Sequence, residues 1–405
     1  MMSHIQRQIT ESMINKSTTG VHVNSQKHHP TSTYKPPMHR TYSLTSLILI
    51  VFLHFSCIDK NTTVGQTHKI GLDSNAKSDT LKFTSVIRAI FQDSKGKYWF
   101  GSSQEGVAMY NGIAFTYFTS KEGLSSNQIH SIQEDTKGTI WFETPSGVSS
   151  YDGIRMTNHT TSNEISLNVF PIRRNTSKIN EWKKKSNDLW FGAGNTSGVY
   201  RYDGLQLKYL ELPPQKVLDP NDNVFAVTGI SEGKNTMIWF ATYAGVFGYN
   251  GSDFTIITDE TLGYDRTVAP LHIRSILEDS KGRLWIGNNG IGVLLKEGDS
   301  IVNFSEKHHL IHPNSKRNGK STSPQGTLEH VFTIEEDSQG NIWFGDRDAG
   351  LWKYDGTQLI NYTSKDGFEN DFVLSIFEDR NNTLWFGMAD GKIYTFNGKR
   401  FEKRF

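Results

Sequence analysis

The sequence predicts an all-β fold, a seven-bladed β-propeller with four antiparallel strands per blade. The first observation is a tryptophan-bearing strand that recurs seven times, at intervals of 42 to 58 residues. A period of this length is typical of four-stranded propeller blades. The second is an Asp-Gly or Asn-Gly pair in six of the repeats, which is the strongest short signal for a β-hairpin. The recurring tryptophans are Trp99, Trp141, Trp190, Trp239, Trp285, Trp343 and Trp385.

Composition narrows the possible functions. The chain has 405 residues, 36% hydrophobic and 12% aromatic, which is enough for a large core and argues against disorder. The formal net charge of +1 offers no bulk attraction for nucleic acid, so no nucleic-acid partner is expected. The single cysteine, Cys57, excludes an internal disulfide framework. No apolar run reaches the roughly 20 residues of a transmembrane helix.

The N-terminal segment has the layout of a targeting sequence. Residues 1–37 are polar and lack apolar periodicity, so they are expected to be disordered or to precede a true start at Met38. Residues 38–57 contain a short basic region, an apolar run over residues 44–55, and then Ser56 and Cys57. This order is that of a secretory signal peptide.

The same segment resembles a bacterial lipoprotein signal peptide. That resemblance implies that Cys57 carries the lipid and becomes the mature N-terminus; a plain signal peptide with an incidental cysteine is the alternative. Residues 58–80 are then a polar tether, and residues 81–405 form the propeller. The expected location is the cell envelope, as a periplasmic or surface-exposed lipoprotein with a lipid anchor to the membrane.

Each repeat opens with a short strand that ends in an acidic turn, as in Asp93-Ser-Lys-Gly96 and Asp337-Ser-Gln-Gly340. Aspartate can accept a hydrogen bond from its own backbone two residues on, and glycine tolerates positive φ. The last copy, Asp379-Arg-Asn-Asn382, has asparagine in that place. The turns lack the alternating oxygen ligands of a calcium loop, so they are interpreted as turns.

The tryptophan strand follows and lacks polar alternation. In Trp343-Phe344-Gly345 the two aromatic side chains point to opposite faces, as expected of a blade packed between two others. The glycine lets the neighbouring backbone approach. The tryptophans are therefore interpreted as core residues. A third strand, the hairpin and a fourth strand complete each blade. The last unit holds all four of its own strands, so closure needs no N-terminal strand, although Leu81–Thr84 could add one.

The repeat resembles the two-component-regulator propeller repeat. The resemblance rests on I-x-x-I-x-E-D-x-x-G-x-L-W-F-G, then G-V-x-x-Y-D-G and F-x-x-Y-T-x-x-x-G-L, and it covers residues 86–405. Three copies depart from the pattern. The third lacks the acidic turn and inserts Asn175–Asn187, the fourth has Ser231–Thr236 in place of the turn, and the fifth has Lys296-Glu-Gly298 in place of Tyr-Asp-Gly.

In that family the repeats form the extracytoplasmic ligand-sensing part of histidine-kinase regulators, commonly linked to carbohydrate sensing. This sequence ends at Phe405, directly after its last strand, and contains no kinase, membrane helix or DNA-binding domain. The resemblance therefore implies a propeller with a binding face, and the signalling role is not expected to transfer. The expected partner is a small ligand such as a glycan, or an envelope protein.

A candidate site lies at one end of the central channel, which the first strand of each blade lines. About five residues before each acidic-turn position, polar and aromatic residues vary while the frame around them repeats, as expected of a binding face. Solvated channel residues without a ligand are the alternative. Arginines there favour an anionic or hydroxyl-rich ligand, and phenylalanines offer stacking surface. The candidate ligand-binding residues are Arg88, His130, Asn223, Phe225, His272, Arg274, His330 and Phe332.

Two further readings of the histidines remain open. The long loop Ser305–Glu329 contains His308, His309 and His312. The sequence does not indicate a carboxylate that would complete a metal site with them, so no metal site is predicted there. A basic lid or a protein-contact arm is the alternative role of this loop. Streptogramin lyases are also seven-bladed propellers and use a His and Glu pair near the channel mouth. Pairs drawn from His130, His272, His330, Glu143 and Glu329 would be the counterpart here. No catalytic residue and no cofactor are predicted.

Overall fold

The computed structural model describes residues 66–69, 78–159, 179–214, 225–265 and 270–405. Its contacts divide the chain into Met1–Lys60, which lies outside these residues, and Asn61–Phe405, which contains the propeller. The expected disordered start, the signal segment and the lipidation site at Cys57 all lie outside the described residues. Within the described part, no helix has the length and apolar character needed to cross a bilayer.

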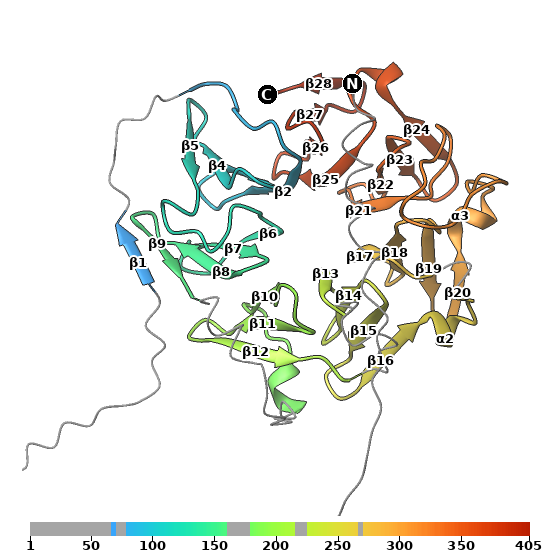
Figure 1. The fold of residues 1–405 in the computed structure, drawn as a ribbon, viewed down its shortest axis with the longest axis horizontal. Coiled ribbons are helices and arrows are strands. Elements are labelled where there is room, and N and C mark those ends of the chain that lie inside the picture. Colours follow the sequence, from blue (N-terminus) through green and yellow to red (C-terminus); the bar gives the residue numbers. More distant parts are fainter. Residues whose placement is uncertain (1–65, 70–77, 160–178, 215–224, 266–269) are drawn as a thin grey trace, which may run out of the picture. The chain divides into compact units, whose positions relative to one another are not determined.

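Seven antiparallel sheets surround a central axis as blades, which confirms the predicted fold (Figure 1). Blade 1 comprises β2 (Ile87–Gln92), β3 (Tyr98–Ser102), β4 (Val107–Tyr110) and β5 (Phe115–Phe118); blade 2 comprises β6 (Ser131–Glu134), β7 (Ile140–Thr144), β8 (Gly147–Tyr151) and β9 (Arg155–Asn158). Blade 3 comprises β10 (Leu189–Gly192), β11 (Gly198–Tyr202) and β12 (Leu207–Glu211); blade 4 comprises β13 (Val227–Glu232), β14 (Ile238–Thr242), β15 (Gly245–Tyr249) and β16 (Phe254–Thr258).

The remaining blades follow the same order. Blade 5 comprises β17 (Ile273–Glu278), β18 (Leu284–Asn288), β19 (Val293–Glu297) and β20 (Ser300–Asn303). Blade 6 comprises β21 (Val331–Glu336), β22 (Ile342–Asp346), β23 (Leu351–Tyr354) and β24 (Leu359–Tyr362); blade 7 comprises β25 (Val373–Glu378), β26 (Leu384–Met388), β27 (Ile393–Phe396) and β28 (Phe401–Lys403). Helix in the described part is limited to single turns: η1 (Ile179–Trp182), α2 (Asp259–Leu262), α3 (Phe304–Lys307) and η2 (Ser364–Asp366).

Blades 2 and 3 depart from four strands. The first strand expected for blade 3, near Phe170, lies outside the described residues. Blade 2 carries a fifth strand, because β1 (Gln66–Lys69) pairs antiparallel with β9 on its outer edge. This strand falls in the segment that the sequence suggested as a tether. The optional strand at Leu81–Thr84 does not form; instead, an isolated bridge joins Ser78 to Phe115 of β5.

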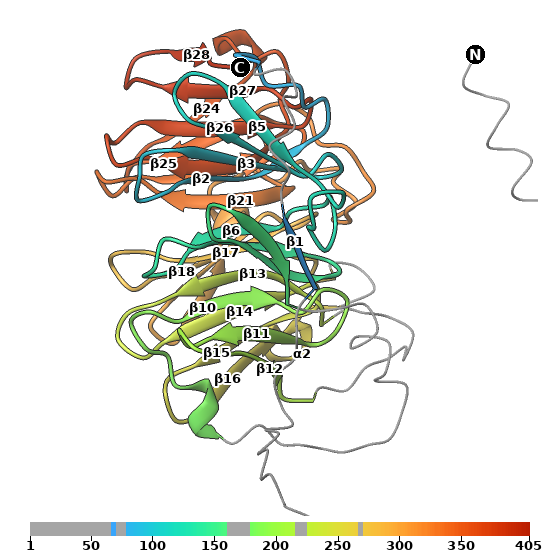
Figure 2. The ribbon, with the colours of Figure 1, turned by 90° about the vertical axis from the view of Figure 1, so that its left-hand side faces the viewer.

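The first strand of each fully described blade is the innermost one, and β25 of blade 7 lies beside β2 of blade 1 (Figures 1 and 2). The ring therefore closes without a swapped strand, as predicted. Antiparallel order places the acidic turns and the Asp-Gly hairpins at one end of the propeller, which we call the turn end. The connections between second and third strands, and those between blades, lie at the opposite end, which we call the loop end.

The acidic turn holds the tryptophan of its own blade. In blade 6, Asp337 Oδ1 accepts hydrogen bonds from the backbone N–H groups of Gln339 and Asn341 at 3.0 and 2.9 Å, and Oδ2 accepts from Trp343 Nε1 at 2.7 Å. The Asn341 side-chain amide also donates to this carboxylate. One buried carboxylate thus satisfies four donors, and its bond to the indole explains the spacing of aspartate and tryptophan in the repeat. The same Trp–Asp bond links Trp99 to Asp93, Trp141 to Asp135, Trp285 to Asp279 and Trp385 to Asp379.

The glutamate that precedes this aspartate joins neighbouring blades. Glu378 of blade 7 accepts hydrogen bonds from Ser338 of blade 6, at 2.7 Å from its backbone N–H and 2.8 Å from its hydroxyl. The same contact joins Ser94 to Glu134 and Ser280 to Glu336. In the E-D-S segment of the repeat, the aspartate therefore forms the turn, and the glutamate and the serine form contacts with the neighbouring blades.

Blades 3 and 4 lack the acidic turn, and their tryptophans are held differently. Trp239 donates its Nε1–H to Glu278 of the next blade at 2.5 Å. Trp190 Nε1 is buried and has no hydrogen-bond partner among the described residues. The guanidinium of Arg201 lies over the Trp190 ring at 5.3 Å and pairs with Asp188 at 2.7 Å. These two blades therefore replace the repeated hydrogen bond with contacts of their own.

The predicted close approach at the repeat glycine is confirmed. A Cβ atom on Gly345 would lie 2.7 Å from the carbonyl oxygen of Val373 in blade 7, so a larger residue would push the blades apart. Trp343 and Phe344 beside it are buried on opposite faces of β22, at 1% and 0% exposure. The core thus runs between the blades around the ring.

Candidate functional site

A β-bulge in the inner strand sets the position of the candidate residues. The ladder between first and second strands skips one residue in five blades, and the skipped residues are Arg88, Thr228, Arg274, Phe332 and Leu374. All five side chains are half-buried. A bulge leaves one residue unpaired and re-aims its side chain. In blade 2, His130 directly precedes β6 and occupies the equivalent position.

This register corrects one assignment made from the sequence. Phe225 was aligned with the bulge position of blade 4, but Thr228 occupies it. Phe225 is buried and packs edge-to-face against Phe247, with ring centroids 6.0 Å apart. The alignment was wrong because blade 4 has no acidic turn from which to count. Asn223 lies outside the described residues.

Arg274 lies between two aromatic rings at the loop end. Its guanidinium carbon is 5.0 Å from the ring centroid of Tyr243 in blade 4 and 5.0 Å from that of Phe332 in blade 6. Nη1 lies 3.5 Å from the Tyr243 hydroxyl, and Nε is buried with no hydrogen-bond partner in the described part of the chain. Burial lowers the pKa of Arg274, the Tyr243 hydroxyl opposes that effect, and repulsion from Arg347 adds to it.

Arg88 and His130 occupy the matching positions of blades 1 and 2. Burial and repulsion from Arg274 lower the pKa of Arg88, so the two guanidinium groups act on each other although they come from blades 1 and 5. His130 Nδ1 lies 3.6 Å from Glu143 Oε1, and Glu143 also accepts a 2.9 Å hydrogen bond from the Ser131 hydroxyl. Glu143 stands where the other repeats have glycine or alanine after Trp-Phe or Trp-Ile.

His272 and His330 are joined through Asn289. His330 Nδ1 donates to Asn289 Oδ1 at 2.9 Å, and Asn289 Nδ2 lies 3.4 Å from His272 Nδ1. Burial, helped by repulsion from Arg274 and His330, lowers the pKa of His272 to about 4. Burial and Arg347 lower the pKa of His330 to about 4, although Asp348 opposes them. Both rings are therefore neutral near pH 7.

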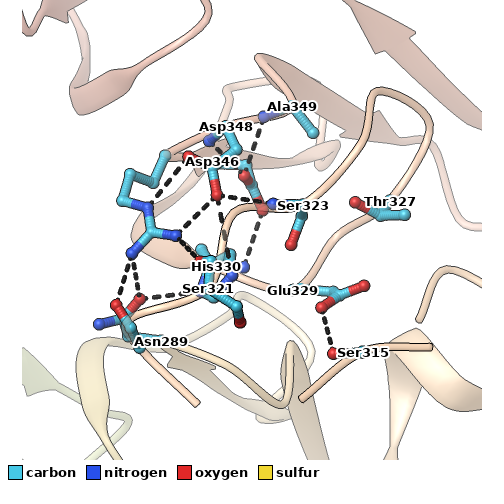
Figure 3. A network of polar contacts seen from close by, with 12 residues as sticks. Asn289, Ser315, Ser321, Ser323, Thr327, Glu329, His330, Asp346, Asp348 and Ala349 are labelled. Atoms are coloured by element: carbon cyan, nitrogen blue, oxygen red, sulfur yellow. Dashed lines mark hydrogen bonds and ion pairs between the residues drawn. The ribbon is translucent and has the colours of Figure 1, made fainter. Parts of the chain in front are cut away.

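Arg347 and Asp348 hold the long loop against blade 6 (Figure 3). Arg347 forms two hydrogen bonds with the Asp348 carboxylate, at 3.1 and 2.7 Å, and donates to the carbonyl oxygens of Gly319 and Ser321. Asp348 in turn accepts from the backbone N–H of Ser323 at 3.0 Å. Asp346 beside it is buried, and burial raises its pKa to about 7.

The loop held in this way forms one wall of a pocket of about 650 Å³. The opposite wall consists of the predicted residues His272 and Arg274 together with Asn289. Residues 318–319 lie directly on that wall: a Cβ atom on Gly319 would be 2.3 Å from Asn289 Nδ2 and 3.0 Å from His272 Nδ1. The lining residues are His272, Arg274, Asn289, Lys316, Asn318, Gly319, Lys320 and Ser321.

The predicted residues thus converge only in part. His272 and Arg274 line the pocket. The Phe332 ring packs against the guanidinium of Arg274 and also against the Phe372 ring, with ring centroids 5.4 Å apart. Arg88 lies within electrostatic reach of Arg274. His330 is fully buried, so it positions Asn289 and is not exposed to a ligand.

Sequence reasoning missed Tyr243, Asn289 and Arg347. All three lie in connections between second and third strands, where the repeat pattern gives no register. The sequence does contain one signal, because Asn289 and Arg347 are polar residues at the same position, two residues after the repeat glycines Gly287 and Gly345. The lining residues of the loop could not be assigned from sequence, since their approach to the channel depends on the Arg347–Asp348 pair.

The histidine loop and the lyase-like pairs do not assemble in the described part of the chain. His308 stacks on Phe304 at 4.4 Å, whereas the backbone N–H of His312 donates to Glu329 at 2.8 Å. No group of three or more metal-ligating side chains gathers among the described residues. The closest described His–carboxylate pairs, His130–Glu143 at 3.6 Å and His330–Asp348 at 3.7 Å, are longer than a hydrogen bond.

A comparison with protein-family models identifies the same repeat that the sequence pattern shows. The family model of the two component regulator propeller matches residues 80–104, 123–142, 268–290, 326–348 and 367–390. These segments fall in blades 1, 2, 5, 6 and 7, so the two blades without an acidic turn are the two that the model does not match. No curated protein sequence matches the chain.

Solved structures with the same fold come from two kinds of protein. The extracellular domains of two hybrid two-component systems from B. thetaiotaomicron superpose with TM-scores of 0.57 and 0.53, at 20% and 21% identity. Each match covers 82% of this chain but only 41% and 40% of the other chain, so this chain spans less than half of those domains. Virginiamycin B lyase from Staphylococcus aureus superposes with a TM-score of 0.54 at 15% identity, over 82% of this chain and 97% of the lyase. At these identities the likeness shows the fold, and the matched segments show that blades 1, 2, 5, 6 and 7 contain two-component-regulator propeller repeats.

Proposed function

We propose that this propeller is an extracytoplasmic binding module, and that its ligand enters the pocket at the loop end between blades 4, 5 and 6. The observation that carries the proposal is the pocket lined by His272, Arg274 and Asn289 together with the loop residues 316 and 318–321, a loop that Arg347 holds in place through two backbone carbonyl oxygens. Concave sites of this size with a few fixed polar groups are typical of small-ligand binding. The extracellular domains of similar fold support the extracytoplasmic location.

Binding without chemistry is the function that the geometry favours. His272 is neutral near pH 7 and accepts from an amide, and no described carboxylate lies within hydrogen-bond distance of its ring. A general acid–base pair requires such contact at about 2.6–3.2 Å. The lyase-like alternative therefore has no residue pair to support it in the described part of the pocket.

The proposal is tested by a thermal-shift screen of the propeller against neutral sugars, sugar acids, amino acids and short peptides, because a ligand that binds the native state raises the melting temperature. A hit is then repeated on Gly319→Val, which places side-chain atoms against His272 and Asn289. We expect the shift to disappear in this variant and to persist in Thr357→Val, a substitution at an exposed position of the turn end. A hit that survives Gly319→Val places the ligand elsewhere and contradicts the proposal.

A further inference from the structure

The charges around the pocket point to one chemical class of ligand. We propose that the pocket binds the anionic group of its ligand, a carboxylate, sulfate or phosphate, at Arg274. This inference rests on the proposed function, because it concerns the same pocket. It adds the group that the ligand must carry and the residues that recognise it.

Arg274 is fixed in a plane and has donors to spare. The Tyr243 and Phe332 rings lie on it at 5.0 Å each, which restricts the guanidinium without using its N–H groups. Within the described residues its one hydrogen bond is the 3.5 Å contact from Nη1 to the Tyr243 hydroxyl. Nε is buried, so the terminal nitrogens are the donors that Arg274 offers to the pocket it lines. Such a fork suits bidentate binding of a planar or tetrahedral anion.

Positive charge accumulates around this position. The half-buried Arg88 side chain has no hydrogen bond or ion pair to any described residue. Burial and repulsion from Arg274 lower its pKa, and Tyr243 and Glu143 act in the opposite direction. Lys316 and Lys320 line the pocket from the loop and are exposed. A bound anion would relieve repulsion that the unliganded protein bears, so like-charged groups brought together in this way favour an oppositely charged ligand.

The nearby carboxylates are engaged by other groups, and Glu143, which favours the charged form of Arg88, forms no ion pair with it. Asp348 is paired with Arg347, and Asp346 accepts three backbone N–H groups. Glu329 accepts from the Ser315 hydroxyl at 2.5 Å and from a backbone N–H. Glu143 is bonded to Ser131. No acidic side chain is among the pocket-lining residues, so the counter-charge has to come with the ligand.

The test is a titration of the propeller with sodium sulfate, phosphate and glucuronate in low-chloride buffer, followed by melting temperature, with glucose as the neutral counterpart. The sulfate and glucuronate arms separate a tetrahedral anion from a carboxylate. Wild type is compared with Arg274→Gln, Arg88→Gln and Arg400→Gln; Arg400 is an exposed arginine at the turn end and serves as the charge-matched control. The control is needed because sulfate stabilises most proteins by exclusion from their surface.

We expect at least one anion to give a saturable shift in wild type and in Arg400→Gln. Its half-saturating concentration should rise about ten-fold or more in Arg274→Gln, the loss of one charge-assisted contact, and less in Arg88→Gln. Equal, non-saturating shifts in all four proteins would overturn the inference. If neutral ligands still bind in the pocket while anions do not, the proposed function stands and only this inference fails.

Discussion

At the turn end, Asp93, Asp279 and Asp337 hold their tryptophans through the same bond, whereas at the loop end the equivalent bulge positions carry side chains as different as Arg274 and Phe332. Both ends belong to the same strands. The same residues recur at the turn end because a buried indole N–H needs an acceptor there and because the blade must contact its neighbour. The loop end is free of that constraint, so its side chains can differ and form one pocket on one side of the ring.

The largest effect should come from removing a turn carboxylate. Asp337→Ala leaves Trp343 Nε1 and the backbone N–H groups of Gln339 and Asn341 without their acceptor, which should lower the free energy of unfolding by about 3 kcal/mol. Asp355→Ala, in an exposed hairpin of the same blade, should cost much less than Asp337→Ala. Urea denaturation measures both. Equal losses would show that the repeated Trp–Asp bond is not what stabilises the turn end.

The next effect concerns pH and belongs to the loop end. The pKa of His330 is lowered to about 4 from 6.5, so the neutral ring is favoured in the fold. Its contribution to stability is fully present above about pH 6.5 and is lost as the pH falls through about 4. A pKa shift of this size corresponds to a contribution on the order of 2 to 3 kcal/mol.

His330→Asn keeps a donor toward Asn289 and removes the titration. Between pH 7 and pH 4 its unfolding free energy should therefore fall less steeply than that of wild type. The comparison cancels the neighbouring groups Asp346, Asp348 and Arg347, which are common to both proteins; Asp346 acts in the opposite direction, since its pKa is raised. Parallel pH profiles would mean that His330 is not held neutral.

A smaller effect separates regular blades from irregular ones. Trp99 and Trp190 are each 2% exposed, but Trp99 donates to Asp93 at 2.9 Å and Trp190 Nε1 has no partner. Replacing each with phenylalanine removes a similar volume. Trp99→Phe should therefore cost about 1 kcal/mol more than Trp190→Phe, the net worth of one buried hydrogen bond. Equal costs from calorimetric melting would contradict the bonding difference between these blades.

The smallest effect on stability is expected from the lysines of the pocket. Lys316 and Lys320 are exposed, so the double variant Lys316→Ala/Lys320→Ala should change the free energy of unfolding by no more than about 0.5 kcal/mol. The same variant should weaken any anion shift and reduce its dependence on salt, because exposed charges act through a screened field. A large loss of stability would mean that the loop end is part of the structural frame.

The division between the two ends also explains what could be read from the sequence. The blade count, the strand order and the role of the tryptophans follow from a pattern repeated seven times, and the structure confirms them. The sequence alignment is wrong where the repeat pattern is missing. Blade 4 has no acidic turn, and its bulge position lies three residues after Phe225. Tyr243 and Asn289 lie in connections whose course depends on contacts between blades, and no local pattern encodes such contacts.

Binding of an anionic ligand group beside Arg274 can be observed directly by the anomalous diffraction of selenate, a heavy analogue of sulfate, in crystals of the propeller. We expect a selenate peak at the channel mouth, within hydrogen-bond distance of the terminal nitrogens of Arg274. Peaks confined to lysines of the turn end, with none beside Arg274, would contradict it.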